Sequence, residues 1–114
     1  MALVNYIGGG EGSGLSETGM SAAGTTQGTA TTLYSQNSDV GTVASGSGVI
    51  LNPVIQVGTE QSVFNSGANP LNIYPPSGFQ INALTTNGAI ILPINTGILF
   101  KCISTTRIFG VLSA

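Results

Sequence analysis

The chain contains few side chains that could carry out acid–base or nucleophilic chemistry. Its six formally charged residues are four carboxylates, one lysine and one arginine, and histidine does not occur. A triad built on histidine is therefore impossible, and a Ser-Lys arrangement would depend on Lys101 or Arg107 alone. Three carboxylates, Glu11, Glu17 and Asp39, lie in a glycine-rich half that would not hold two of them at a fixed separation. We therefore expect that the protein is not an enzyme.

Cofactor and metal motifs are also missing from the sequence. A single cysteine and no histidine leave no cluster that could bind zinc, so a metal site could use only oxygen ligands. The run Gly8–Gly14 is rich in glycine but lacks the GxGxxG spacing, and no glycine is followed by lysine as in a phosphate-binding loop. We interpret this run as a hinge and expect no cofactor.

The sequence allows two interpretations of Cys102. It lies in the middle of an apolar stretch, where a free cysteine usually behaves as a small buried hydrophobic side chain. The alternative is a thiol activated by Lys101. Neighbouring residues of a strand point to opposite faces, so the first reading is favoured.

The scarcity of charge is the main anomaly of the composition. Charged residues make up 5% of the chain and hydrophobic residues 41%, whereas soluble domains average about 25% charged residues. A surface of this kind gives little protection against self-association, so we expect neighbouring molecules to cover much of it. No basic residue precedes Lys101, so we expect no nucleic-acid partner.

The sequence also argues against export and membrane insertion. The first residues contain no basic side chain and no long apolar run, so we expect no secretory signal and synthesis in a cytoplasm. Pro, Asn, Gly and Thr interrupt every apolar run well short of the roughly 20 residues that a membrane-spanning helix needs. We therefore expect no membrane partner.

The two halves of the chain differ in composition. Residues 1–48 hold eleven of the seventeen glycines and none of the prolines, which predicts an extended Gly/Ser/Thr-rich arm. A flexible linker without contacts is the alternative. Apolar side chains near the start favour an arm that binds another subunit, and we expect four of them to contact it: Leu3, Val4, Tyr6 and Ile7. Residues 49–114 are predicted to form a compact β domain.

From residue 49 onward, short apolar runs alternate with turn residues, and no stretch has the length and periodicity of a helix. This pattern predicts an all-β fold, a small β-sandwich or barrel-like knob. Asn87-Gly88 is read as a hairpin signal. The strands are expected at 49–51, 54–57, 62–65, 71–74, 79–84, 89–92, 97–104 and 107–112. In the strand at 97–104 both faces carry apolar residues, which indicates that both are largely covered.

The stretch from Val63 to Asn82, with Ile73-Tyr74-Pro75 followed by a glycine turn and Ile81-Asn82, resembles structural proteins of tailed bacteriophages. The apolar strands from Ala89 to Val111 are similar to the strands with which those proteins end, although the C-terminal region reads Arg107-Ile108-Phe109-Gly110-Val111 where an aromatic such as Trp is expected. The resemblance covers about the last 65 residues. It implies a head decoration (cement) protein, commonly a trimer, or a component of the tail or fibres.

Two functions follow from these observations and the resemblance. The first is a capsid decoration protein on the surface of the virion, whose partners are the major capsid protein and further copies of itself. For the homo-oligomer interface we predict a small apolar set, Ile90, Ile91, Leu92 and Ile94, because this segment is apolar on both faces. A central strand buried within one chain would explain the same pattern.

The second function is a tail-fibre or receptor-binding module that engages a host surface glycan. Such a module needs exposed aromatic side chains that stack on sugars. The chain has no tryptophan and only three tyrosines, Tyr6, Tyr34 and Tyr74. The composition therefore favours the decoration protein.

Overall fold

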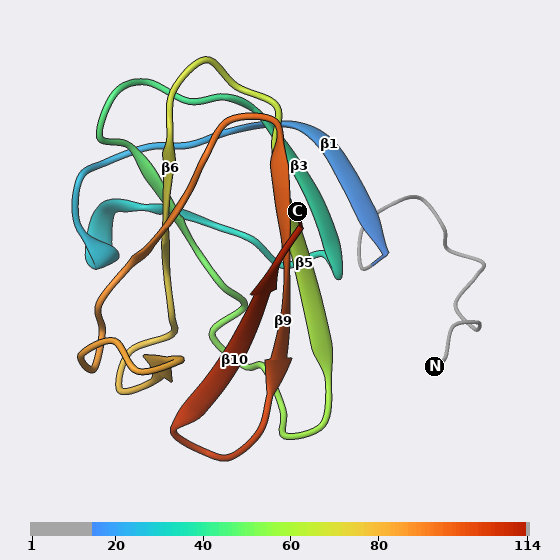
Figure 1. Ribbon diagram of the computed structural model, residues 1–114, viewed down its shortest axis with the longest axis vertical. Helices are drawn as coiled ribbons and strands as arrows, with labels where there is room; N and C mark the ends of the chain where they lie inside the picture. The colour runs from blue at the N-terminus through green and yellow to red at the C-terminus, as the bar shows by residue number, and fades with distance from the viewer. Residues whose placement is uncertain (1–14, 114) are drawn as a thin grey trace.

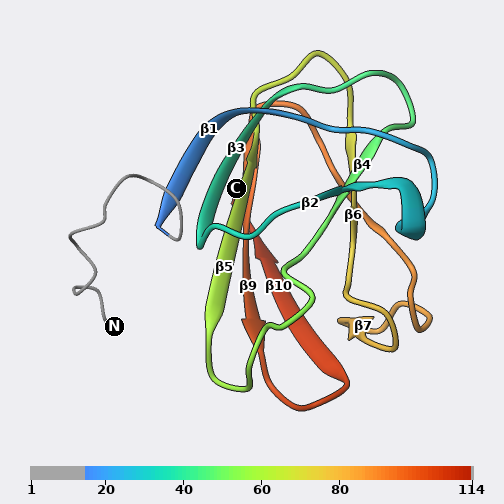
Figure 2. The same cartoon turned by 180° about the vertical axis from the view of Figure 1, so that it is seen from behind.

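The computed structural model describes residues 15–113, which form a sandwich of two β-sheets (Figures 1 and 2). The six-stranded sheet has the order β1 (Ser16–Ser21), β3 (Asn37–Thr42), β5 (Glu60–Asn65), β9 (Thr96–Cys102), β10 (Arg107–Leu112) and β7 (Gln80–Ile81). The four-stranded sheet has the order β2 (Thr31–Thr32), β4 (Gly48–Ile50), β6 (Leu71–Tyr74) and β8 (Ile90–Leu92). One 3-10 turn, η2 (Gln27–Thr29), is the helical element of this region. The expectation of an all-β fold is confirmed.

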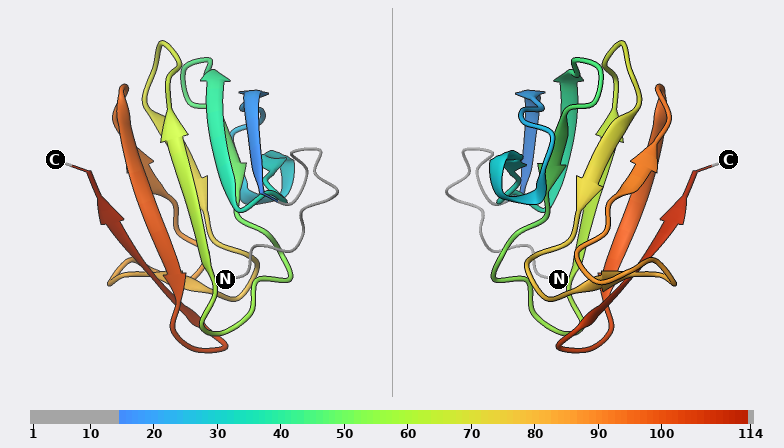
Figure 3. Two further views of the ribbon diagram at one scale, coloured as in Figure 1. Left: turned by 90° about the vertical axis from the view of Figure 1, so that its right-hand side faces the viewer. Right: turned by 90° about the vertical axis from the view of Figure 1, so that its left-hand side faces the viewer.

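The first six strands alternate between the two sheets. In the six-stranded sheet β1, β3 and β5 are parallel neighbours, and in the four-stranded sheet β2, β4 and β6 are parallel neighbours. Parallel neighbours need a crossover connection, and here each crossover supplies a strand of the opposite sheet. The chain therefore winds as a flattened coil before β8, β9 and β10 close the two sheets, with antiparallel pairings of β6–β8, β5–β9 and β9–β10. Figure 3 shows the longer strands of the six-stranded sheet fanning out from β10 to β1.

The core lies between the sheets and is built from strand residues that alternate inward. Phe100 is its largest fully buried side chain, and aliphatic residues from both sheets surround it. On β5 the inward positions are Gln61, Val63 and Asn65, so a valine is flanked by two buried amides. Gln61 donates to the carbonyl oxygens of Leu33 (2.8 Å) and Ser35 (3.2 Å), which satisfies backbone groups that would otherwise be buried without partners.

Residues 15–48 do not form the extended arm that the composition predicts. They contribute β1, β2, β3 and the start of β4 to the two sheets, and Leu33, Val40 and Val43 are buried in the core. The backbone hydrogen bonds of a ladder do not require apolar side chains, so a Gly/Ser/Thr-rich segment can pair with apolar strands supplied by the second half. The prediction of a compact domain limited to residues 49–114 is wrong for the same reason. The arm residues Leu3, Val4, Tyr6 and Ile7 fall outside the described residues.

Most strands expected in the second half are found close to their predicted positions. The expected strand at 54–57 is wrong, because these residues form turns in which Val54 is 71% exposed. Of the strand expected at 79–84, only Gln80–Ile81 forms a strand, which is β7. Asn87 adopts a φ of 67°, but Gly88 donates to the carbonyl of Thr85 in a turn within a loop that joins different sheets, so the expected hairpin does not form.

Candidate interaction surface

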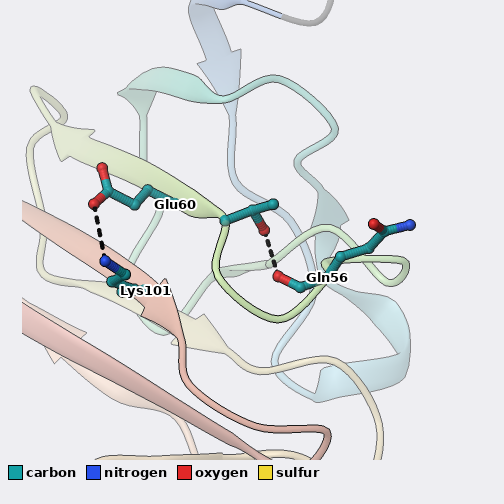
Figure 4. Close-up of polar contacts among 4 residues, drawn as sticks. Gln56, Glu60 and Lys101 are labelled. Atoms are coloured by element: carbon teal, nitrogen blue, oxygen red, sulfur yellow. Dashed lines mark hydrogen bonds and ion pairs between the residues drawn. The ribbon is translucent and has the colours of Figure 1, made fainter. Parts of the chain in front are cut away.

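The charged side chains of residues 15–113 are dispersed rather than gathered into a catalytic group. Lys101 Nζ lies 4.0 Å from Glu60 Oε2 across neighbouring strands, as Figure 4 shows, and both side chains are about half exposed. Beside them Thr59 Oγ1 donates to the carbonyl of Gln56 at 2.6 Å and fixes the turn before β5. A solvent-exposed ion pair of this kind stabilises a protein by at most about 1 kcal/mol. The ion pair and the neighbouring hydrogen bond therefore have a structural role.

The remaining described carboxylates each accept a hydrogen bond from a serine. Ser35 Oγ donates to Glu17 Oε1 at 2.9 Å, and Ser66 Oγ donates to Asp39 Oδ1 at 2.6 Å. Over residues 15–113 there is no group of three or more Asp, Glu, Cys or His side chains that could hold a metal ion. These side chains do not form a recognisable acid–base or metal-binding arrangement.

Cys102 lies on the inward face of β9 and is buried. Its Sγ donates to the carbonyl of Ser104 at 3.3 Å. Burial raises the pKa of this thiol, whereas an activated cysteine needs a lowered one. Lys101 points to the opposite face, so the reading of Cys102 as a small core residue is confirmed.

The unusual feature of the molecule is a cluster of exposed apolar side chains on the outer face of the six-stranded sheet, over β5, β9 and β10. The ion pair of Glu60 and Lys101 lies on the same face. We define the outer apolar face by Phe64, Leu99, Phe109 and Val111, which are 43%, 43%, 43% and 68% exposed. The register makes them neighbours, because Val111 pairs with Leu99, and Phe64 pairs with Gly97 two residues before Leu99. Solvent-facing sides of antiparallel strands are normally polar. A contiguous apolar patch on such a side indicates a surface that contacts another molecule or segment.

Part of this face is hollowed into a groove of about 650 Å³. Its apolar lining includes Phe64, Leu99 and Val111, and its far wall is formed by β1 and β3, where Asn37 and Asp39 contribute polar side chains. Ser62 Oγ is hydrogen-bonded to Asn37 Oδ1, so part of the polar rim is already satisfied within the chain. The two carboxylates that line the groove, Glu17 and Asp39, each accept a hydrogen bond from a serine. The groove therefore combines an apolar floor with a polar rim that is partly bonded within the chain.

The opposite outer face of the sandwich is partly covered by the chain itself, over β4 and the end of β6. The segment 22–30 approaches the four-stranded sheet, where η2 packs against β4 and Tyr74 donates its hydroxyl hydrogen to the carbonyl of Thr25 at 3.0 Å. Gln27 Nε2 also donates to the carbonyl of Pro75 at 2.8 Å. These contacts leave the six-stranded sheet as the more open of the two faces.

The residues predicted for an oligomer interface are divided by the fold. Leu92 is fully buried and Ile90 is half-buried against the core, whereas Ile91 and Ile94 are 60% and 45% exposed. Strand β8 is an edge strand, so the alternative of a central strand buried within one chain is wrong. Only Ile91 and Ile94 are free to contact another molecule, and their role as an interface remains a prediction.

The outer apolar face was only partly visible in the sequence. Apolar residues on both faces of 97–104 indicated that Leu99 and Ile103 would be covered, yet in the single chain they are 43% and 46% exposed. Phe109 and Val111 alternate with inward residues in the same way and offered the same signal. These side chains and Phe64 share one surface because of the order of the strands in the sheet. That order cannot be read from the sequence.

The part of the chain that the structure describes contains no helix long and apolar enough to span a membrane. Comparison with known proteins adds no relative, since the chain matches no protein-family model, no curated protein and no solved structure.

Proposed function

We propose that the protein is a structural component of a virus particle, a decoration protein that binds the outside of a tailed-bacteriophage capsid as a homo-oligomer and stabilises it. The observation that carries the proposal is the outer apolar face in a chain of which only 5% of the residues are charged. An exposed apolar surface of this kind favours a lasting contact over free solution. The resemblance of residues 63–111 to phage structural proteins supplies the identity of the assembly.

Two separate surfaces serve two kinds of contact in this proposal. The major capsid protein binds at the end of the six-stranded sheet where Phe109 lies beside Arg107, whose Cζ is 6.0 Å from the aromatic ring. Aromatic and arginine side chains are the residues that most often dominate binding energy at protein interfaces. Further copies of the chain bind at Ile91 and Ile94 on the edge of the four-stranded sheet.

The described residues give less support to glycan binding by a tail fibre. Tyr34 is 65% exposed and lies beside a shallow hollow of about 260 Å³, but no second aromatic residue lines that hollow. Tyr74 is engaged with Thr25. Sugar-binding sites usually present an aromatic platform with polar partners, and here the platform is a single ring.

The direct test is sedimentation of the purified full chain with mature capsids of the phage whose genome encodes it, prepared without their decoration protein. We expect saturable co-sedimentation. Phe109→Lys should weaken binding by at least about tenfold, since losing roughly 1.4 kcal/mol is sufficient. Val57→Lys is the matched control, because Val57 is 55% exposed in the turn before β5 and does not belong to the outer apolar face. Equal binding by the two variants would exclude the outer face as the contact, and absence of wild-type binding would remove the proposal.

A further inference from the structure

We infer that the groove on the six-stranded sheet is a docking site for the N-terminal segment of the same chain, with Leu3, Val4, Tyr6 and Ile7 as the side chains that enter it. The inference concerns the free protein and does not depend on the proposed function. It gives these four residues a receptor within the molecule, whereas the sequence alone pointed to another subunit. Residues 1–14 lie outside the described residues, so the case rests on the groove, the point where the segment joins it and the chemistry of both.

The chemistry of groove and segment agrees. The floor presents Phe64, Leu99 and Val111, and a volume of about 650 Å³ can accept several apolar side chains. Residues 3–7 read Leu-Val-Asn-Tyr-Ile, which has four apolar or aromatic side chains and no charge. Removing such side chains and the floor from water together is favourable by about 25 cal/mol for each Å² of apolar surface buried.

The segment joins the fold at the wall of the groove. Ser16, Glu17 and Thr18 of β1 line it, so the residues that precede Leu15 start at its edge. From β1 to β9 there are three strand spacings, since the order is β1-β3-β5-β9, or about 14 Å. The seven residues Gly8–Gly14 can span up to about 23 Å when extended. Residues 3–7 can therefore reach the apolar floor without any movement of the sandwich.

Docking within the chain is favoured over docking between chains. A short linker that spans the distance gives its segment an effective concentration of order millimolar at the groove. The segment of another molecule reaches such a concentration only in very concentrated solution. Five of the seven residues Gly8–Gly14 are glycines, and glycine tolerates the backbone angles that a turn back over β1 would require.

The experiment is site-specific photo-crosslinking of the full chain with p-benzoylphenylalanine in place of Tyr6. After irradiation, gel electrophoresis separates products within one chain from products between chains, and mass spectrometry locates the bond. We expect a product of single-chain size with bonds to β5, β9 or β10 around Phe64, Leu99 and Val111. The same photo-crosslinker in place of Val57 is the control and should leave these residues unmodified.

A second variant tests the groove itself. Leu99→Asp, introduced with the crosslinker at position 6, places a carboxylate on the floor, and docking would bury it without a partner. We expect the yield of groove products to fall at least about fivefold, with circular dichroism confirming that the fold is retained. Bonds only to other parts of the chain, only between chains, or no bonds at all would overturn the inference. Capsids are not involved, so this outcome is independent of the sedimentation result.

Discussion

Asn65 joins the turn that follows it in the sequence to Leu92, which lies 27 residues away. Its Nδ2 donates to the carbonyl oxygens of Asn69 (2.9 Å) and Leu92 (3.1 Å), and its Oδ1 accepts from the amide of Gly67 (2.9 Å). Because Asn65 belongs to one sheet and Leu92 to the other, this fully buried side chain ties the two sheets together. A buried amide with both ends bonded specifies the geometry around it, since any displacement leaves polar groups without partners.

We expect Asn65→Ala to lower the free energy of unfolding by about 2 to 4 kcal/mol, because it leaves several buried backbone groups without partners. The measurement is urea denaturation followed by circular dichroism. Ser38→Ala is the control, since Ser38 is also buried but its Oγ has no hydrogen-bond partner among the described residues. Ser38→Ala should be nearly neutral or stabilising. A loss as large for Ser38→Ala as for Asn65→Ala would contradict this account of the bonds.

The burial of Cys102 predicts that the free energy of unfolding depends on pH. Burial raises the pKa of its thiol in the folded chain because desolvation disfavours the thiolate. The folded state therefore holds this proton more tightly than the unfolded state does. The resulting stabilisation is undiminished below the unfolded pKa of about 8.5 and is lost as the pH rises beyond it.

The free energy of unfolding should thus fall as the pH rises above about 8.5 in the wild type, and fall less steeply in Cys102→Ala. Urea titrations at constant ionic strength measure both slopes. Parallel slopes for the two proteins would mean that Cys102 contributes nothing to the pH dependence.

At the scale of elements, the pairing of β9 with β10 depends on a glycine. Gly110 is the Cα partner of Phe100, and a Cβ at position 110 would come within 2.8 Å of Ile98 Cδ1 and 3.0 Å of Phe100 Cε1. The phenylalanine ring occupies the space that a side chain would need. Phe100 can be fully buried because its cross-strand neighbour has no side chain.

Gly110→Ala should therefore lower the free energy of unfolding by about 1 to 3 kcal/mol through overpacking. Gly41→Ala is the matched control in β3, where a Cβ would meet only Ser66 Oγ at an ordinary 3.7 Å. It should be neutral or slightly stabilising, because alanine restricts the unfolded chain. Thermal denaturation of both variants gives the comparison, and similar melting temperatures would argue against a tight contact at Gly110.

At the scale of the whole molecule, charge and apolar surface are distributed unevenly. The described charged residues, Glu17, Asp39, Glu60, Lys101 and Arg107, all belong to strands of the six-stranded sheet. The edge of the four-stranded sheet instead exposes Ile91, followed by Ile94, without a formal charge on its strands. An uncharged apolar edge is a favourable place for identical subunits to meet, since like charges do not oppose their approach.

We expect the full chain to form an oligomer in solution and Ile91→Lys to convert it to a monomer, because the lysines of neighbouring copies would repel one another. Phe109→Lys should leave the oligomer intact, since it acts on the proposed capsid surface. Light scattering coupled to size-exclusion chromatography measures both. An oligomer that Ile91→Lys leaves intact would place self-association elsewhere on the chain. A wild-type monomer would contradict the expectation that the chain self-associates.

The fold class and most strands of the second half could be predicted from the amino-acid sequence alone. Strands β6 and β10 occupy their predicted residues 71–74 and 107–112, because in each of them apolar residues lie between clear turn signals. The sequence also shows that the chain contains no histidine, which excludes a triad built on that residue. These are local or compositional properties, so they can be read without knowledge of which strands are neighbours.

Only the tertiary structure decided the role of residues 15–48 and the place of the outer apolar face. Strands β1 and β3 are poor in apolar side chains and depend on backbone pairing. Strand β1 pairs with β3, and β3 pairs with β5, a partner that begins 18 residues after β3 ends. Likewise, Phe64, Leu99 and Val111 share a surface because β5, β9 and β10 are adjacent. Hydrophobic periodicity shows that a strand has two faces, but which face another layer covers depends on contacts between residues far apart in the chain.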